Sequence, residues 1–209
     1  MRIIDISQPL EPATAVWPGD RRFELDWTLQ RAAGDTVNVA AIALSVHTGT
    51  HLDGFRHVTD TGPPAAGIPL GSCIGPATVR DVRGRSPLGP ELLEGIDARR
   101  TPRVLFRTRE HVDATDFPDN FAWIDPELAR RLGQEGFLLV GTDAPSIDPF
   151  DSRELPSHHA LVAGGVVNLE NLVLTEVPPG DYILVALPLK LTTADSSPVR
   201  AVLLDGGWS

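Results

Sequence analysis

Short apolar runs bounded by polar residues, glycine or proline recur along the whole chain. Residues 36–46 alternate loosely and then become continuously apolar, which predicts a buried strand. Further short runs predict strands at residues 77–82, 104–108, 137–142, 169–174, 182–187 and 199–204. The pattern therefore indicates a protein built mainly from short strands.

Residues 126–135 carry the clearest helix signals. Asp125 is a good N-cap, Pro126 suits the first turn, and Gly136 follows as a stop. A shorter helix is expected to start at Pro90. Many strands with two or three helices between them predict the α/β class with a mixed sheet.

Composition limits the domain organisation. The chain has 209 residues, of which 42% are apolar and 22% charged, as in an ordinary globular protein. Nineteen glycines and nineteen prolines imply many turns, so long helices cannot dominate. Residues 60–71 are rich in both and predict a long surface loop that is too short to separate domains. We therefore expect one domain over residues 1–209.

Charge and cysteine content narrow the function. Eighteen basic and 28 acidic residues give a formal charge of −10, which argues against a nucleic-acid partner. No basic run favours a membrane surface, and no segment approaches the roughly 20 apolar residues of a spanning helix. The single cysteine, Cys73, is expected to be small and buried, and it excludes an internal disulfide. These features predict a cytoplasmic protein in which histidine and carboxylate would have to hold any metal.

The histidines are the strongest chemical signal. Three of the six lie in one stretch of eleven residues, HTGTHLDGFRH, at residues 47–57. Its threonines and glycines disfavour a helix, so we expect a turn after a strand that can point His47, His51 and Asp53 at one place. Two nitrogen ligands and one oxygen ligand suit zinc or manganese. The alternative is a surface loop with incidental histidines.

A second candidate cluster follows later in the chain. His158 and His159 are adjacent in SHH, so only one of them should face a common site. Glu170 lies in the otherwise apolar stretch VVNLENLVL, where it is either paired or at a strand edge facing solvent.

Three other residues have open interpretations. His111 lies in a charged stretch and is expected to be solvated. Asp143 follows an apolar run, where it either serves a site or caps a turn. Trp17 is presented by a Pro-Gly-Asp turn and is either a core anchor or an aromatic wall for a planar substrate.

Together, these motifs resemble the cyclase-like metal hydrolases. HTGTHLDGFRH is similar to the HxGxHxDxPxH signature of that family, which includes bacterial kynurenine formamidases and isatin hydrolases. VWPGD, GTDAPSIDP, SHH with Glu170, and LPLKLTTADSSPVRAVL resemble the formamidases, in the same order along nearly the whole chain. The resemblance implies a swivelling β/β/α domain with a barrel-like core and few short helices, found as a homodimer.

The resemblance also implies roles for individual residues. The metal ligands would be His47, His51, Asp53, His158 and Glu170, with Asp53 and Glu170 shared by two ions. The metal would be Zn²⁺, two per chain, with Mn²⁺ as the alternative. His57 matches the catalytic proton-transfer histidine, and Trp17 matches the aromatic residue that borders the substrate.

The sequence departs from the family signature at one position. Phe55 stands where the family has proline, so the stiffness of the loop and the shape of the substrate pocket are expected to differ. Glu170 favours the formamidases, because the isatin hydrolases have glutamine at the matching position.

The expected activity is hydrolysis of a small aromatic formamide, N-formyl-L-kynurenine, to L-kynurenine and formate by hydroxide on the metal, with His57 as proton shuttle. One alternative is hydrolysis of isatin or another small cyclic amide or lactone. The other is a homologue that binds metal without turnover. The absence of a GxSxG motif argues against a serine hydrolase.

Overall fold

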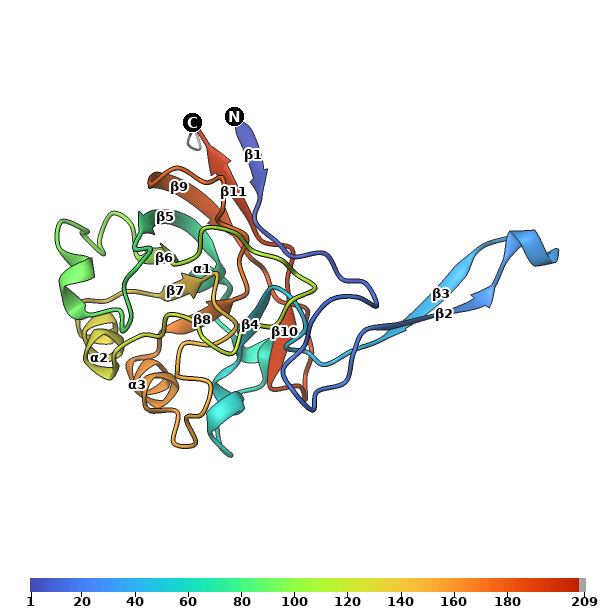
Figure 1. Cartoon of the computed structure of the whole chain (residues 1–209), viewed down its shortest axis with the longest axis horizontal. Coiled ribbons are helices and arrows are strands. Elements are labelled where there is room, and N and C mark those ends of the chain that lie inside the picture. The colour runs from blue at the N-terminus through green and yellow to red at the C-terminus, as the bar shows by residue number, and fades with distance from the viewer. Residues whose placement is uncertain (207–209) are drawn as a thin grey trace.

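The computed structural model of the chain describes residues 1–206 and places nine strands in one mixed sheet (Figure 1). In spatial order these are β1 (Arg2–Asp5), β11 (Val202–Asp205), β9 (Gly180–Val185), β5 (Ile74–Asp81), β6 (Arg103–Arg107), β7 (Leu139–Thr142), β8 (Val167–Glu170), β4 (His51–Asp53) and β10 (Ser196–Pro198). Strands β5 to β8 are parallel, and the pairings on either side of them are antiparallel.

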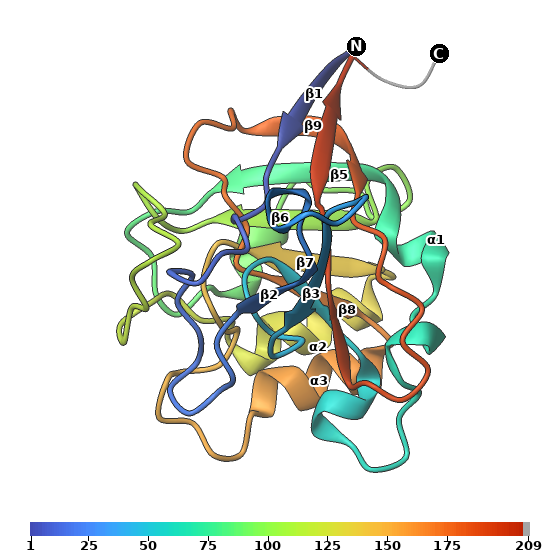
Figure 2. The same ribbon diagram turned by 90° about the vertical axis from the view of Figure 1, so that its right-hand side faces the viewer.

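The sheet has a hydrophobic core on each face. Helices α2 (Pro126–Gln134) and α3 (Pro156–Gly164) pack together on one face, over a cluster that includes Phe106, Leu128 and Leu161. A second cluster, which includes Leu52 and Leu169, fills the other side. Figure 2 shows β1 lying steeply across the direction of β5, β6 and β7, and the sheet curls into a half-barrel. The predicted fold class is confirmed.

Several predicted elements are present. Strands β6 and β7 coincide with the predicted runs 104–108 and 137–142 to within two residues, and their apolar residues are buried as parallel strands require. Helix α2 begins at Pro126 after Asp125, whose carboxylate accepts the backbone N–H of Glu127 at 2.7 Å. At Pro90 the chain forms only a short 3₁₀ helix, Pro90–Leu93.

Two predictions about residues near the histidine stretch are wrong. The apolar run 36–46 is not buried: its strand β3 (Val39–Ala43) pairs only with β2 (Glu24–Leu29), in a hairpin that extends away from the rest of the chain (Figure 1). Residues 60–71 are not simply a surface loop. They contain the 3₁₀ turn Ala65–Gly67 and the start of helix α1 (Leu70–Cys73), and two of their residues, Ala65 and Ile68, are buried in the core.

Cys73 ends α1 and is buried, as predicted. Burial raises the pKa of its thiol to about 11, despite the nearby positive charge of Arg103. Within residues 1–206, no helix is both long and apolar enough to cross a membrane.

Candidate metal centre and cavity

The register between β4 and β8 places four polar residues on one face of the sheet. Side chains alternate along β4, so His51 and Asp53 face one side while Leu52 enters the core. Strand β8 runs antiparallel to β4 and pairs Glu170 with His51 and Asn168 with Asp53. Paired residues share a face, so this three-residue strand brings two carboxylates and an imidazole together.

Helix α3 supplies a second imidazole. Its first turn carries Ser157 and His158, both buried, whereas the next residue, His159, is exposed. Asp148 anchors this turn: its carboxylate accepts the backbone N–H groups of Ser157 and His158, each at 3.0 Å. A carboxylate at the N-terminus of a helix satisfies free backbone donors and complements the helix dipole. As a result, His158 points at the carboxylates of β4 and β8.

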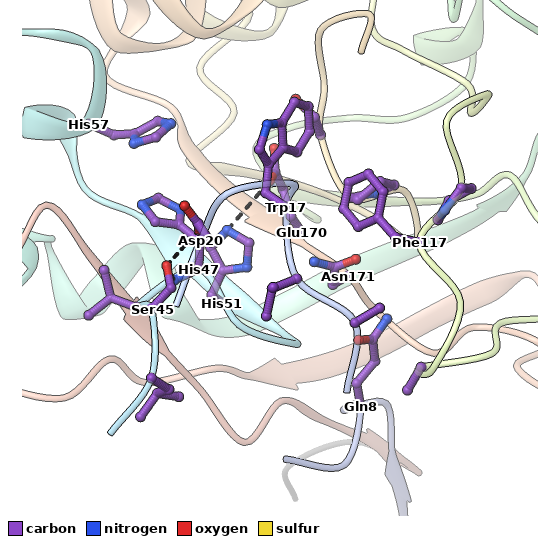
Figure 3. A pocket seen from close by; sticks show the side chains of 18 of the residues that line it. Gln8, Trp17, Asp20, Ser45, His47, His51, His57, Phe117, Glu170 and Asn171 are labelled. Atoms are coloured by element: carbon purple, nitrogen blue, oxygen red, sulfur yellow. Dashed lines mark hydrogen bonds and ion pairs between the residues drawn. The ribbon is translucent and has the colours of Figure 1, made fainter. Parts of the chain in front are cut away.

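The side chains of these elements meet at short and similar distances. His51 Nε2 lies 3.4 Å from Asp53 Oδ1 and 3.4 Å from Glu170 Oε2. His158 Nε2 lies 3.5 Å from Asp53 Oδ2 and 3.4 Å from Glu170 Oε1. His47, in the turn before β4, brings its Nδ1 to 3.2 Å from Asp53 Oδ1. Figure 3 shows His51 directed toward Glu170 in this cluster.

Hydrogen bonds on the outer side fix the orientation of two imidazoles. His51 Nδ1 donates to the carbonyl of Gly49 at 2.9 Å, and His158 Nδ1 donates to Asp148 Oδ2 at 2.6 Å. In each neutral ring the proton is therefore on Nδ1, and the lone pair on Nε2 faces the carboxylates. Metal-ligating histidines are oriented in this way by partners outside the ligand set.

The cluster fits a divalent metal. Ligand atoms about 2.0–2.2 Å from a tetrahedral ion lie about 3.3–3.6 Å apart, which matches the separations of 3.2–3.5 Å between the nitrogen and carboxylate atoms. Among the described residues, His51 Nε2 is buried without a hydrogen-bond partner. Imidazole nitrogens with carboxylate oxygens are a donor set for zinc or manganese.

The protonation states of the cluster also indicate a site for a cation. Burial lowers the pKa of His47, but hydrogen bonds to Asp195 and Asp53 outweigh burial and raise it to about 9. Burial would raise the pKa of Asp53, but hydrogen bonds from His158, His47 and His51 hold it well below the usual value. Without metal, the carboxylates therefore hold protons on the imidazoles, which supply the positive charge that a cation would bring.

His57 lies next to this cluster on the 3₁₀ helix Phe55–Val58. A ring nitrogen of His57 lies within 4.8 Å of ligand atoms of Asp53 and His158. Its Nδ1 lies 3.2 Å from Asp195 Oδ2. The structure thus brings His57 together with all five predicted ligands.

Sequence reasoning missed three polar residues at the cluster. Asn168 donates to Asp53 Oδ2 at 2.9 Å and to Glu170 Oε1 at 2.7 Å. Asp148 orients His158, and Asp195 contacts His47 and His57. Asp195 lies in the LPLKLTTADSSPVRAVL motif, and Asp148 lies in GTDAPSIDP. Each motif therefore contains a carboxylate to which the sequence analysis gave no role, and this could have indicated both residues.

A cavity of about 770 Å³ opens beside the cluster. His47, His51, His57, His158 and Glu170 line one part of it. The other walls include Trp17 and Phe117, whose rings meet edge to face with centroids 5.3 Å apart (Figure 3). The charged residues Arg109, Asp113 and Asp116 also line the cavity. The cavity thus combines an aromatic wall, both signs of charge and the candidate metal ligands.

Phe55 is not part of the wall of the large cavity. It packs against the core beneath the sheet and is not among the residues that line the large cavity. Phe55 therefore makes no direct contact with the large cavity, and an effect of this residue on loop stiffness or pocket shape stays a prediction.

The structure gives no sign of a catalytic role for two other candidates, His111 and Asp143. His111 is exposed, as expected. Asp143 is fully buried, and its carboxylate accepts the hydroxyl of Thr108 at 2.6 Å and the backbone N–H groups of Thr108 and Arg109. Asp143 therefore caps the chain after β6.

Comparison with known proteins identifies relatives over the full length. The Cyclase family, described as "Putative cyclase", matches residues 4–149. A kynurenine formamidase of Salinibacter ruber is 49% identical over 208 residues, 98% of each chain. A solved structure described as a potential metal-dependent hydrolase with cyclase activity is 28% identical, covers 97% of this chain and 96% of its own, and superposes with a TM-score of 0.82. The structure of isatin hydrolase A from Labrenzia aggregata is 26% identical, covers 97% of this chain and 93% of its own, and superposes with a TM-score of 0.82.

Proposed function

Since the chain belongs to the Cyclase family, we propose that it is a metal-dependent amidohydrolase that converts N-formyl-L-kynurenine and water to L-kynurenine and formate. The observation that carries this proposal is the cluster of oriented imidazoles and buried carboxylates beside a cavity with an aromatic wall. Close similarity to a kynurenine formamidase over the full length supports this choice of amide.

We assign the ligands to two zinc positions, with manganese as the alternative metal. His47, His51 and Asp53 would hold one ion, and Asp53, His158 and Glu170 would hold the other. The Glu170 oxygens face both histidine groups, so this carboxylate would contact both ions. When bound, zinc supplies Lewis acidity that polarises an amide carbonyl and lowers the pKa of water from about 15.7 to about 7.

The chain's own residues would bind the substrate and move the proton. Trp17 would stack against the aryl ring from the cavity wall. As the water oxygen bonds to the formyl carbon and the C–N bond breaks, His57 would accept the water proton and deliver it to the departing aryl amine. The second proton of the water leaves with formic acid, which ionises to formate at neutral pH, so formate and the free amine are the products and the histidine ends in its starting state.

A substrate and metal panel tests the proposal. The zinc-loaded protein should release kynurenine from N-formylkynurenine, and removal of metal by a chelator should abolish turnover until zinc is returned. Isatin is the matched comparison, because an isatin hydrolase shares the fold. Preferred turnover of isatin would support the cyclic-amide alternative. Tight zinc binding without turnover of either compound would identify a homologue that only binds metal.

We also infer that the protein is a homodimer, joined through the β2–β3 hairpin. Leu25 pairs with Ile42, and Trp27 shares their face, which leaves an apolar surface exposed: the three are 42%, 59% and 52% accessible. An isolated two-stranded hairpin is marginally stable in water, and exposed apolar patches of this kind mark interfaces. A second copy is the simplest partner that would cover the hairpin.

Light scattering with size-exclusion chromatography tests this inference. The wild-type protein should have twice the chain mass, and Trp27→Ser with Ile42→Ser should shift it to monomer at the same concentration. Asp26→Ser with Thr28→Ser, at the intervening positions of β2, is the matched control. A monomeric wild-type protein would contradict the inference.

The cytoplasmic location and the single domain over residues 1–209 stay predictions. Cell fractionation tests the location, and limited proteolysis tests the domain, which should resist cleavage as one unit.

A further inference from the structure

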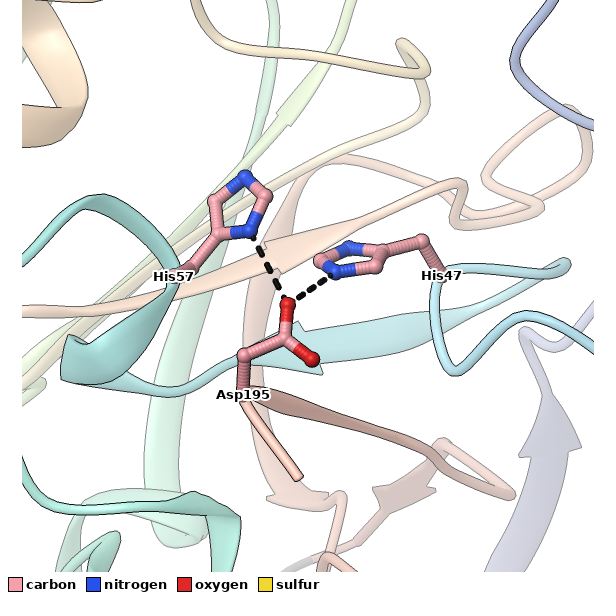
Figure 4. A group of neighbouring side chains, drawn as sticks. All are labelled: His47, His57 and Asp195. Atoms are coloured by element: carbon pink, nitrogen blue, oxygen red, sulfur yellow. Dashed lines mark hydrogen bonds and ion pairs between the residues drawn. The ribbon is translucent and has the colours of Figure 1, made fainter. Parts of the chain in front are cut away.

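One carboxylate joins the candidate metal ligands to the candidate proton carrier. Asp195 lies between β9 and β10, and its Oδ2 is 2.8 Å from His47 Nε2 and 3.2 Å from His57 Nδ1 (Figure 4). The rings of His47 and His57 lie side by side, with centroids 4.4 Å apart. A single oxygen therefore contacts both imidazoles.

The backbone holds Asp195 in this position. Its carbonyl accepts the N–H of Gly54 at 2.8 Å, and the next residue, Ser196, pairs with Asp53 in the β10–β4 ladder. The approach is so close that a Cβ on Gly54 would lie 2.3 Å from the Asp195 carbonyl oxygen, which explains glycine at this position. Asp195 is thus attached to the same segment that carries Asp53 and His57.

The hydrogen bonds determine where the protons lie. Asp195 Oδ2 faces one ring nitrogen of each imidazole, and an aspartate carboxylate is ordinarily ionised at neutral pH. An ionised carboxylate only accepts hydrogen bonds. His47 therefore carries a proton on Nε2, and His57 carries one on Nδ1. A neutral His57 then has its lone pair on Nε2, the ring nitrogen left for a molecule in the cavity that His57 lines.

We propose that Asp195 is a positioning residue that holds His57 as the Nδ1–H tautomer, so that Nε2 accepts and returns the proton during hydrolysis. The same oxygen holds the Nε2–H of His47, which leaves His47 Nδ1 facing Asp53. Asp195 itself gains no proton, and it acts only through the two imidazoles. The arrangement follows the logic by which a buried aspartate orients a catalytic histidine. This inference rests on the proposed function.

The decisive measurement is the tautomer of His57, read by ¹⁵N NMR of the zinc-loaded protein with labelled histidine. In the wild-type protein the proton should be on Nδ1. Asp195→Ala should remove this preference, and Asp195→Asn, which keeps the shape but not the charge, should weaken it. At saturating zinc, kcat for N-formylkynurenine should fall about 10²-fold or more in Asp195→Ala, with KM little changed. Asp195→Asn should fall less.

Asp60→Asn is the matched control, because Asp60 is an exposed carboxylate three residues after His57. It should leave the tautomer and kcat unchanged. A wild-type His57 protonated on Nε2, or an unchanged tautomer in both Asp195 variants, would overturn the proposal. A wild-type protein that fails to hydrolyse N-formylkynurenine would refute the proposed function instead, since the NMR measurement needs no substrate.

Discussion

Replacement of Glu170 by glutamine should affect the two proposed metal positions unequally. Glu170 Oε1 accepts the backbone N–H of Ile147 at 3.1 Å and the amide of Asn168 at 2.7 Å, whereas Oε2 faces His51 Nε2 at 3.4 Å. Glutamine has one side-chain oxygen, and these two donors should hold it in the Oε1 position. Its NH₂ group would then occupy the Oε2 position and face His51.

The size of the effect follows from this orientation. On the His51 side, Glu170→Gln replaces a charged oxygen ligand by a donor that cannot bind metal. Loss of a partner outside the ligand set already lowers metal affinity about 10–100-fold, so loss of this ligand should cost at least about 100-fold, or about 2.7 kcal/mol. On the His158 side an oxygen remains and only its charge is lost, so we expect about a tenfold decrease there.

Zinc titration against a chromophoric chelator would measure the two affinities, and anomalous diffraction from crystals grown with limiting zinc would assign each to a position. Glu154→Gln is the matched control, because Glu154 is an exposed glutamate on the loop before α3. Equal loss at the two positions, or a larger loss on the His158 side, would refute the orientation argument. Unchanged affinity at both would show that Glu170 is not a ligand.

Three further predictions test the charge and the chemistry. His57→Ala should keep zinc content near the wild-type value by elemental analysis while kcat falls about 10²-fold or more; loss of zinc would make His57 a ligand. Because the pKa of His47 is raised to about 9 in the metal-free protein, its protonation stabilises the fold below about pH 6.5 and this contribution is lost as pH rises through 9. Zinc requires the neutral ring, so the increase in Tm on adding zinc should grow between pH 6.5 and 9, and a constant increase would contradict this. Arg109→Gln should raise KM about tenfold for N-formylkynurenine but leave KM for formanilide, which lacks the amino-acid group, unchanged.

The sequence predicted helices and strands correctly where the local pattern agreed with how the element packs in the fold. The N-cap at Asp125 and the apolar runs of β6 and β7 are local patterns, and the structure satisfies each with near neighbours. The run at 36–46 misled because its apolar side chains are exposed on a hairpin that extends from the sheet. Periodicity indicates that a face is apolar, but it does not say what covers that face.

Helix α3 shows why the positions of site residues were harder to predict. It follows Leu155, which adopts a left-handed conformation at φ 43°, and the carboxylate that caps it belongs to Asp148, several residues earlier in the chain. A search for an N-cap next to the helix cannot find such a partner. Asp195 was missed for the same reason, since 138 residues separate it from His57 and only the β10–β4 pairing brings them together.

The outer hydrogen bonds distinguish the imidazoles from one another. Among the described residues, His51 and His158 each give their Nδ1 proton to an acceptor behind the ring, so Nε2 faces the carboxylates. His47 is held by Nε2 instead, which presents Nδ1 to Asp53. His57 shares the acceptor of His47 but is held by Nδ1, so its free nitrogen belongs to the cavity. Residue type alone makes all four equivalent as ligands. The nitrogen that the chain holds decides which imidazole can bind metal between carboxylates and which is left to move a proton.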